Sequence, residues 1–470
     1  MTQDDEDEDV PGFSDDLQRA VKSSLLALLR SPEIFPFTDS PRTWTTIEEA
    51  RSTLALAAGH DLPAPVSDWT GVDVTADETI SRMTFAGFAG WRLRLLTADE
   101  QRYAEKDGAT YAVSFAELKA FPVRAGFERF GATAFFNSSR HVVCINVAAR
   151  DLDVRPVDAA PHDWAHAKWV WRSSAIVGAT ANEHLMMNHL VFSNIAMRAA
   201  REKLPRDHPL RRFLKPFNHR TPTVNMNAME FLTLENSLLH RTLAFTYDGL
   251  VGALQAGLHT ARMRGSPLAH LDDVSAELGA AFPFAEDGNA LYKVVKNFTA
   301  AYVSEYYTSD AALLADSALK DMWDGVRVFG DSSGLPEWKY LTRPIFTEFL
   351  ASFVWHVTGG HHLFGNVAEF LKDPTFVTGR LRAGSEVADV EASHLALCVA
   401  ILTGMRAPRL LSDFKHVLLD DAHILNTSAY FDDFQADLLQ LDDAIAERNV
   451  QRPWRFDGFS PHRLLSSVAI

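Results

Sequence analysis

The spacing of apolar residues along the chain predicts a protein that is mainly α-helical. In most segments apolar residues recur every three or four positions, as they do in helices that bury one face. The longest such run covers residues 163–202 and contains no proline. Further helices are predicted at residues 12–32, 229–237, 244–263, 289–307, 310–326, 344–370, 386–403 and 428–448. We therefore expect a large helical body.

Two segments depart from the helical pattern. Residues 132–148 contain two β-rich runs on either side of Asn137–Arg140, which predicts a β-hairpin. Residues 452–470 contain two prolines and no clear period, so an irregular, extended segment is expected there. The predicted organisation is an acidic, disordered tail, a helical and loop segment that wraps the body, and one large domain, at residues 1–11, 12–75 and 76–470 respectively.

Composition narrows the class of protein. The chain has 470 residues, 47% of them hydrophobic, which is enough for a large buried core. A net charge of −16 argues against nucleic acid as a partner, because a phosphate backbone requires a basic face. The two cysteines cannot form a disulfide framework, and the acidic start does not resemble a signal peptide. No apolar run reaches the length of a membrane span. We expect a cytoplasmic protein without stable membrane insertion, and its oligomeric state stays open.

The first candidate metal ligands are His184 and His189, which are five residues apart in the longest helical run. On a regular α-helix they would lie roughly 140° apart around the axis. A single π-turn would bring both to one face, and such turns gather at functional sites. The alternative interpretation is two polar residues on a half-buried helix.

The second pair is His362 and Asn366, four residues apart and therefore on one helical face. His361 competes with His362 for the ligand role, and we prefer His362 because the asparagine follows it at this spacing. His361 would then lie behind the ligands, as would His356. The alternative is a set of core histidines bound to main-chain carbonyls.

A further ligand is suggested by the last residue. Ile470 places a main-chain carboxylate on an apolar residue, and such a terminus can fold inward and offer an oxygen to a metal. Imidazoles combined with oxygen ligands suit non-haem iron, with manganese as the alternative. Zinc hydrolases usually carry a glutamate inside a His-Glu-x-x-His motif, whereas Glu183 precedes His184 here, so that match fails.

Several segments together resemble the lipoxygenase family. Their order and spacing agree with the family from residue 160 to residue 470, and a fainter match lies at Asp77–Gly87. The segments are Trp164–Lys168, Glu183–Leu190, His208–Leu210, Leu214–Pro216, Arg220–Thr221, Val224–Ala228, Ala301–Tyr307, Asp310, Asp316, Leu319–Trp323 and Ala446–Asn449. The resemblance implies a short, bacterial-type lipoxygenase without the N-terminal β-barrel domain of many relatives. It also implies that His184, His189, His362, Asn366 and the Ile470 carboxylate bind one iron.

The same resemblance implies an activity. Such an enzyme inserts O₂ into the cis,cis-1,4-pentadiene of a polyunsaturated fatty acid and gives a lipid hydroperoxide. Ala228 matches the family position that biases product stereochemistry, and alanine there suggests an S-configured product. Glu369 replaces the usual glutamine and would add charge behind the ligands. Three alternatives stay open: oxygenation of a non-standard lipid, isomerisation of a fatty acid hydroperoxide, and a non-catalytic lipid-binding role.

Overall fold

The computed structural model describes residues 73, 75–258, 263–328, 330–365, 379–384, 408–418 and 424–468. The predicted acidic tail, almost all of the wrapping segment and the helix at 386–403 lie outside these residues. So do Asn366, Glu369 and Ile470. The predicted domain boundaries therefore stay predictions.

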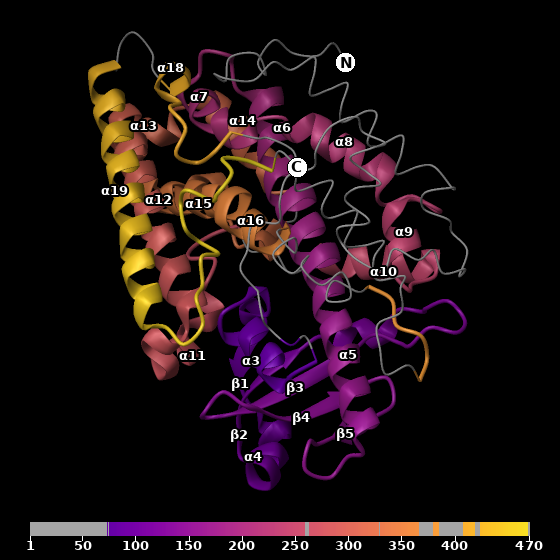
Figure 1. Ribbon diagram of the computed structural model, residues 1–470. Helices are drawn as coiled ribbons and strands as arrows, with labels where there is room; N and C mark the ends of the chain where they lie inside the picture. The colour runs from indigo at the N-terminus through magenta and orange to yellow at the C-terminus, as the bar shows by residue number, and fades with distance from the viewer. Residues whose placement is uncertain are drawn as a thin grey trace, which may run out of the picture.

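A five-stranded antiparallel sheet lies at one end of the molecule (Figure 1). Its strands follow chain order and are β1 (Leu93–Leu95), β2 (Ala109–Ser114), β3 (Ala132–Asn137), β4 (Val142–Val147) and β5 (Leu152–Val154). The predicted hairpin is confirmed as β3 and β4, with Phe135 opposite Cys144 and Arg140 at a φ of 67° in the turn. The other three strands were not predicted, because two are only three residues long.

The sheet buries both of its faces. Phe136 and Ile145 point into the main core, while Phe135 and Cys144 point to the opposite side. On that side Tyr103 of helix α4 (Gln101–Asp107) stacks on Phe135 with ring centroids 3.8 Å apart. Alternate residues of a strand face opposite sides, so one hairpin serves both clusters.

The predicted run at 163–202 is confirmed as one continuous helical rod. It consists of α5 (Pro161–Val177), a π-helix over Gly178–Ser193 and α6 (Asn194–Lys203). A second rod is formed by α15 (Arg343–Trp355), a π-turn over His356–Gly360 and α16 (His361–Gly365). The α16 and π-turn segments pack against the long π-helix, so the two π segments meet inside the helical body.

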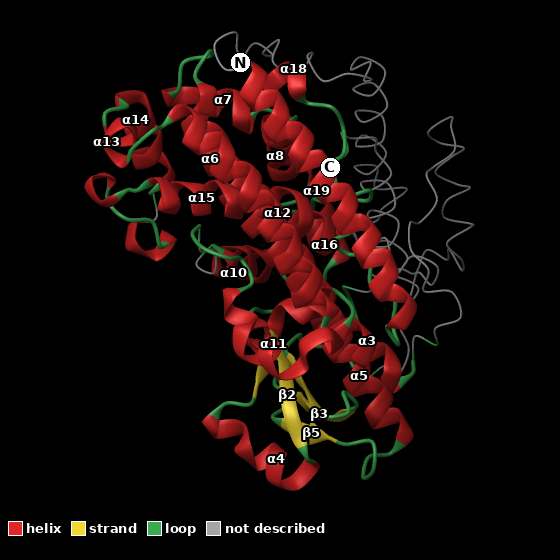
Figure 2. Cartoon of the chain, turned by 90° about the vertical axis from the view of Figure 1, so that its left-hand side faces the viewer, coloured by secondary structure: helices red, strands yellow, loops and turns green. Residues whose placement is uncertain are grey.

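Long helices flank these two rods. In Figure 1, α12 (Pro283–Tyr306) lies between α15 and α19 (Ile424–Gln451), and it contacts both. Figure 2 shows the sheet beneath this helical body. The remaining helices are α3 (Asp77–Phe85), α7 (Pro209–Leu214), α8 (Thr221–Phe231), α9 (Leu238–Thr242), α10 (Tyr247–Gly257), α11 (Asp272–Leu278), α13 (Asp310–Leu314), α14 (Ser317–Val326) and α18 (Lys415–Leu418).

The helix predicted at 229–237 is wrong. Pro222 occupies the first turn of α8, which begins at Thr221 and ends at Phe231. Residues 232–237 are irregular, and Asn236 has a φ of 59° that interrupts a right-handed helix. The apolar spacing there belongs to the end of one helix and the start of another.

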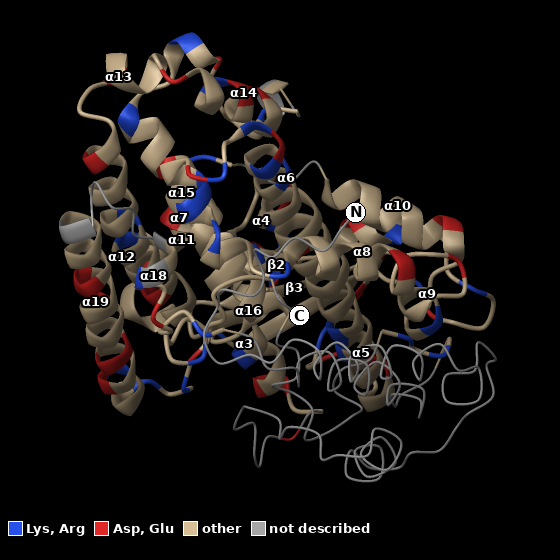
Figure 3. Ribbon diagram, turned by 90° about the horizontal axis from the view of Figure 1, so that it is seen from above, with Lys and Arg blue, Asp and Glu red and all other residues tan. Residues whose placement is uncertain are grey.

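Charged residues lie mainly on the outer helices, as the red and blue segments of α19 and α14 show in Figure 3. The core contains large aromatic side chains such as Trp171, Trp323 and Trp355, each fully buried. Among the described residues, no helix has both the length and the apolar character needed to cross a membrane.

Candidate metal centre

The π-helix Gly178–Ser193 brings His184 and His189 together. The Nε2 atoms of the two rings are 3.3 Å apart. In a π-helix residue i bonds to residue i+5, so residues at this spacing lie close to one another on the same side. This confirms the expected geometric effect of a π-turn, and the π segment extends over 16 residues rather than one turn.

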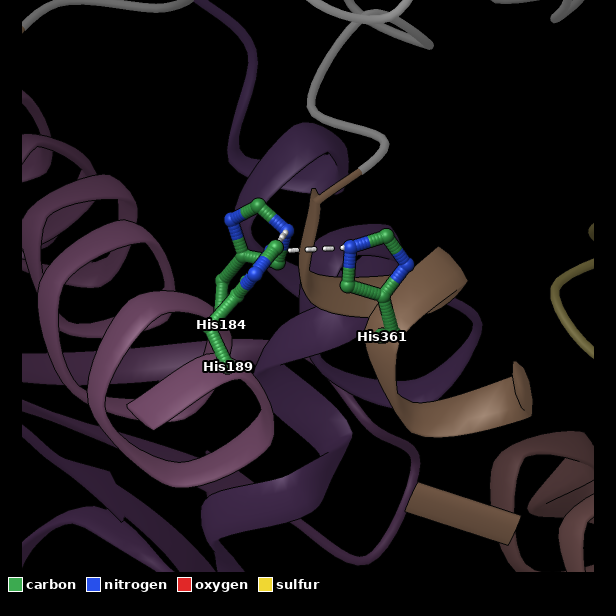
Figure 4. Close-up of side chains that lie close together, drawn as sticks. All are labelled: His184, His189 and His361. Carbon is green, nitrogen blue, oxygen red and sulfur yellow. Dashed lines mark hydrogen bonds between the residues drawn. The ribbon is translucent and has the colours of Figure 1, made fainter. Parts of the chain in front are cut away.

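The third imidazole of the cluster belongs to His361. Its Nε2 atom is 3.0 Å from Nε2 of His189, and one ring nitrogen from each of the three histidines lies within 4.8 Å of the others. Figure 4 shows the three side chains converging, two from the π-helix and one from α16. Within the described residues, these three form the cluster of side chains that could hold a metal ion.

His362 is not part of this cluster, and His361, which the sequence argument placed behind the ligands, occupies that place instead. Adjacent residues on an α-helix point about 100° apart, and only one of two neighbouring histidines can face the cluster. Burial lowers the pKa of His362 to about 3, and the neighbours that lower it further are Arg463, Arg409 and His462 of the C-terminal part of the chain.

The separations of the imidazole nitrogens fit a shared metal ion. Two donors bound at about 2.0–2.1 Å from an ion would lie about 2.9 Å apart at a right angle and about 3.3 Å apart at a tetrahedral angle. The separations of 3.0 and 3.3 Å between His189 and its two neighbours agree with this range, while the three donor atoms taken together lie within 4.8 Å of one another. Three neutral imidazoles are ligands that iron, manganese and zinc all accept.

Asn225 of α8 fixes the tautomer of His189. Its Nδ2 donates to the main-chain carbonyl of His189 at 2.9 Å, which leaves Oδ1 3.0 Å from the ring Nδ1. An amide oxygen only accepts, so Nδ1 carries the ring proton and donates it. Nε2 then has the lone pair that a metal ligand needs. Ser193 donates to the same carbonyl at 2.6 Å and supports the arrangement.

Burial keeps the cluster neutral. His189 and His361 are buried, and His184 is partly covered. Burial, and then the neighbouring His189, lower the pKa of His184 well below its usual value. Desolvation disfavours the imidazolium form of His184, so its neutral ring keeps one nitrogen without a proton, and that nitrogen can coordinate a metal ion.

A hydrogen bond joins the two π segments beside the cluster. The ring Nδ1 of His356 lies 3.0 Å from Oδ1 of Asn188, and the His356 ring stacks on Phe192 at 3.8 Å. Burial lowers the pKa of His356 to about 3, so this ring is neutral. His189 follows Asn188 in the chain. The hydrogen bond therefore holds the π-turn that precedes His361 against the π-helix that carries His184 and His189. The prediction of a supporting role for His356 agrees with these contacts.

Glu183 does not face the cluster. Its carboxylate accepts hydrogen bonds from the Arg92 guanidinium, with Nε–Oε1 at 2.7 Å and Nη2–Oε1 at 2.6 Å. Arg92 also pairs with Glu117 and donates to the carbonyl of Ser114 on β2. Glu183 therefore anchors the π-helix to the sheet. This structural position agrees with the sequence, in which Glu183 is not the glutamate of a His-Glu-x-x-His motif.

The C-terminal segment enters the protein interior. The hydroxyls of Ser466 and Ser467 donate to the carbonyls of Pro216 and His219 at 3.1 and 3.0 Å, and both serines are fully buried. Val468 is buried as well. The predicted irregular conformation is confirmed for residues 452–468.

Ala228 is buried on α8, three residues after Asn225. Residues at this spacing share a helical face, so Ala228 lies on the side of α8 that holds His189. Asn225 lies in the Val224–Ala228 segment, and no role was predicted for it from the sequence. The signal that could have indicated this role was an asparagine in a helix interior, because a buried amide group needs hydrogen-bond partners.

Comparison with known proteins finds similarity to lipoxygenases. The Lipoxygenase family model matches residues 277–371, which include both His361 and His362. The chain is similar to Lipoxygenase 7, chloroplastic, of Oryza sativa subsp. japonica, with 27% identity over 238 residues that cover 45% of this chain and 25% of that protein. It is also similar to human Hydroperoxide isomerase ALOXE3, with 28% identity over 219 residues that cover 43% of this chain and 30% of that protein.

Solved structures extend the likeness to nearly the whole fold. The coral 8R-lipoxygenase matches with a TM-score of 0.77 at 16% identity, over 97% of this chain and 75% of that chain. The chain has the fold of a lipoxygenase catalytic domain. Manganese lipoxygenase of Gaeumannomyces graminis also shares the fold, with a TM-score of 0.69 at 16% identity over 97% of this chain and 91% of that one. The matched stretches span only about a quarter to a third of the two curated lipoxygenase relatives.

Proposed function

We propose that this chain is a lipoxygenase that binds one non-haem metal ion between His184, His189 and His361, with iron as the first candidate and manganese as the second. The observation that carries the proposal is the convergence of three imidazoles, two buried and one partly covered, with Nε2 separations of 3.0 and 3.3 Å from His189. The manganese enzyme among the structural relatives supports the second metal.

The proposed reaction inserts O₂ into the cis,cis-1,4-pentadiene of a polyunsaturated fatty acid and yields a lipid hydroperoxide. When bound, the metal would supply the one-electron redox step. The protein contributes the fixed tautomer of His189, neutral imidazoles and a water-poor surrounding formed by buried side chains such as Leu185 and Met187. A solved relative was crystallised in complex with arachidonate, which supports a fatty acid of this kind as substrate.

The carboxylate of Ile470 is proposed as an additional oxygen ligand. The support is that Ser466, Ser467 and Val468 are fully buried and that the two serines are held by side-chain hydrogen bonds. An inward-directed terminus brings a carboxylate into the interior, where a charged group requires a partner such as a metal ion.

A second candidate function is the isomerisation of a fatty acid hydroperoxide. The observation that favours it is the similarity to Hydroperoxide isomerase ALOXE3 of human, mouse and rat. Both reactions use a redox metal and a long acyl substrate, so the same cluster could serve either. Fatty acid substrates compared with their hydroperoxides would distinguish the two.

The test is O₂ uptake together with the rise of conjugated-diene absorbance on linoleate and arachidonate. We expect both signals with the metal-loaded chain and neither with His189→Ala. His141→Ala is the matched control, because His141 lies in the exposed turn between β3 and β4. If the metal-loaded chain consumes no oxygen on any diene and converts no hydroperoxide, the proposed function is wrong.

A further inference from the structure

The helical segment that carries His184 and His189 has a geometry that needs support from its surroundings. The π-helix Gly178–Ser193 is 16 residues long, whereas π geometry is usually limited to single turns inside α-helices. It follows α5 directly and leads directly into α6, and both of these are α-helical. Contacts outside the segment must therefore favour π geometry over α geometry along this stretch, and those contacts keep the two histidines together.

On the side of the sheet, the π-helix meets the guanidinium of Arg92. Nε and Nη2 of Arg92 donate to Oε1 of Glu183 at 2.7 and 2.6 Å, and the two side chains are only 19% and 8% exposed. Nη1 of Arg92 donates to the main-chain carbonyl of Ser114 on β2 at 3.3 Å and pairs with Glu117. The guanidinium also lies over the ring of Phe115, 4.6 Å from its centroid. The sheet end of the molecule therefore fixes the position of Arg92.

A second contact with the same guanidinium lies five residues earlier in the π-helix, at Gly178. A Cβ atom added to Gly178 would lie 2.8 Å from Cδ1 of Phe115 and 3.7 Å from Nη2 of Arg92. Nη2 is also the nitrogen that binds Glu183, so Gly178 and Glu183 face one group. A π-helix places residues at this spacing on one side. On a regular α-helix they would lie roughly 140° apart and would not face the same guanidinium.

The two histidines of the π-helix have the same spacing. His184 follows Glu183 in the chain, and His189 comes five residues after His184. If the segment adopted α geometry, the joint contact of Gly178 and Glu183 with Arg92 would be lost together with the convergence of the two imidazoles. Both pairs of residues thus depend on one helical register, and Arg92 selects that register from outside the cluster.

We propose that Arg92 is a positioning residue for the metal centre, which acts through Glu183 and holds residues 178–193 in the π register. This inference rests on the proposed function in one respect, namely that the three imidazoles bind a metal ion. It goes beyond the proposed function by assigning the geometry of the cluster to an ion pair between the π-helix and the sheet.

The experiment compares the full-length wild type with Arg92→Met, Arg92→Lys and the matched control Arg94→Met. Arg94 lies two residues further along, on β1, and binds Glu100 rather than the π-helix. The first quantity measured is the affinity for Co²⁺, by competition with a chelator while the visible absorption of the cobalt is followed. The second is the amide hydrogen exchange of residues 178–193 in the metal-free proteins, followed by mass spectrometry.

Arg92→Met should weaken Co²⁺ binding by about 10–100-fold, the range that follows the loss of a group that orients a metal ligand. It should also speed amide exchange in residues 178–193, because a segment with fewer contacts opens more often. Arg92→Lys should recover part of the affinity, since lysine keeps the charge but lacks the planar fork that binds Glu183 through two nitrogens. Arg94→Met should leave both quantities unchanged.

The outcomes separate positioning from a purely structural role. If folded Arg92→Met is less stable but binds Co²⁺ within about tenfold of the wild type, Arg92 only stabilises the fold, and the inference is overturned with the metal site intact. Equal amide exchange of residues 178–193 in Arg92→Met and the wild type would overturn it whether or not metal binds. A wild type that binds no Co²⁺, Fe²⁺ or Mn²⁺ would overturn the proposed function, and the inference with it.

Glu183→Gln provides the same test from the other partner if Arg92→Met does not fold. Glutamine keeps the shape of Glu183 but removes the ion pair with Arg92. We expect Co²⁺ binding to weaken by about tenfold and amide exchange in residues 178–193 to become faster. A wild-type value of either quantity in Glu183→Gln would contradict the role assigned to Arg92.

Discussion

The ring Nδ1 of His189 and the amide Oδ1 of Asn225 lie 3.0 Å apart, both buried, and this contact orients the central imidazole of the cluster. His189 is central because its Nε2 is within 3.3 Å of the corresponding atom of each of the other two histidines. Asn225 also bonds to the main chain of His189, so the contact fixes both the ring and the helix that carries it.

Asn225→Ala is therefore expected to weaken metal binding by about 10–100-fold while the three histidines remain. The loss follows because the His189 ring would no longer be held in the tautomer that presents a lone pair at Nε2. Metal affinity is measured by chelator competition. Asn227→Ala is the matched control, because Asn227 is half-buried two residues further along the same helix. Equal affinities of the two variants would contradict the role assigned to Asn225.

His356 makes the stability of the fold depend on pH. Burial lowers its pKa in the folded state to about 3, below the value near 6.5 of an unfolded chain. Between these two values the unfolded state binds the extra proton, so acid favours unfolding. The contribution of His356 to the free energy of unfolding is fully present above pH 6.5 and is lost as the pH falls toward 3. At pH 5 the loss from this ring is about 2 kcal/mol.

The measurement is urea denaturation of the wild type and His356→Asn at pH 7 and pH 5. Asparagine can still donate to Asn188 but does not titrate. The free energy of unfolding should fall between pH 7 and pH 5 in both proteins. We expect this fall to be about 2 kcal/mol smaller in the variant than in the wild type. An identical fall in both proteins would show that His356 does not titrate as described.

The buried carboxylate of Asp287 holds the start of the C-terminal segment. It accepts hydrogen bonds from both terminal nitrogens of Arg452 at 2.7 and 2.8 Å, and it pairs with Arg448 at 2.7 Å. Asp287→Ala should lower the free energy of unfolding by about 3–5 kcal/mol, because it leaves two guanidinium groups without this buried counter-charge. Thermal unfolding measures the effect. Asp324→Ala, which removes an exposed pair with Lys320, should change nothing measurable.

Much of the fold was predictable because apolar periodicity reports helices directly. The rod around residues 163–202 and the β3–β4 hairpin are confirmed, since each depends on local patterns of side chains. The strands β1 and β5 were missed because three residues give no usable period, and their pairing is set by distant segments. The choice between His361 and His362 could not be made from sequence, because it depends on the rotation of α16 against the π-helix.

Ala228 is expected to influence the product rather than metal binding. It is buried on the same face of α8 as Asn225, which contacts His189. Ala228→Gly removes the alanine methyl group and should change the ratio of R to S hydroperoxide, with the metal content unchanged. Chiral chromatography of the products measures the ratio. A product of unchanged configuration would exclude a role of this position in stereocontrol.

The central claim, a metal ion held by His184, His189 and His361, is tested most directly by the metal content of two neighbouring variants. His361→Ala and His362→Ala remove adjacent imidazoles from the same helix, but only the first contributes to the cluster. Elemental analysis of the purified proteins should find about one iron or manganese per chain in the wild type and in His362→Ala, and almost none in His361→Ala. Metal lost from His362→Ala and retained in His361→Ala would contradict the account.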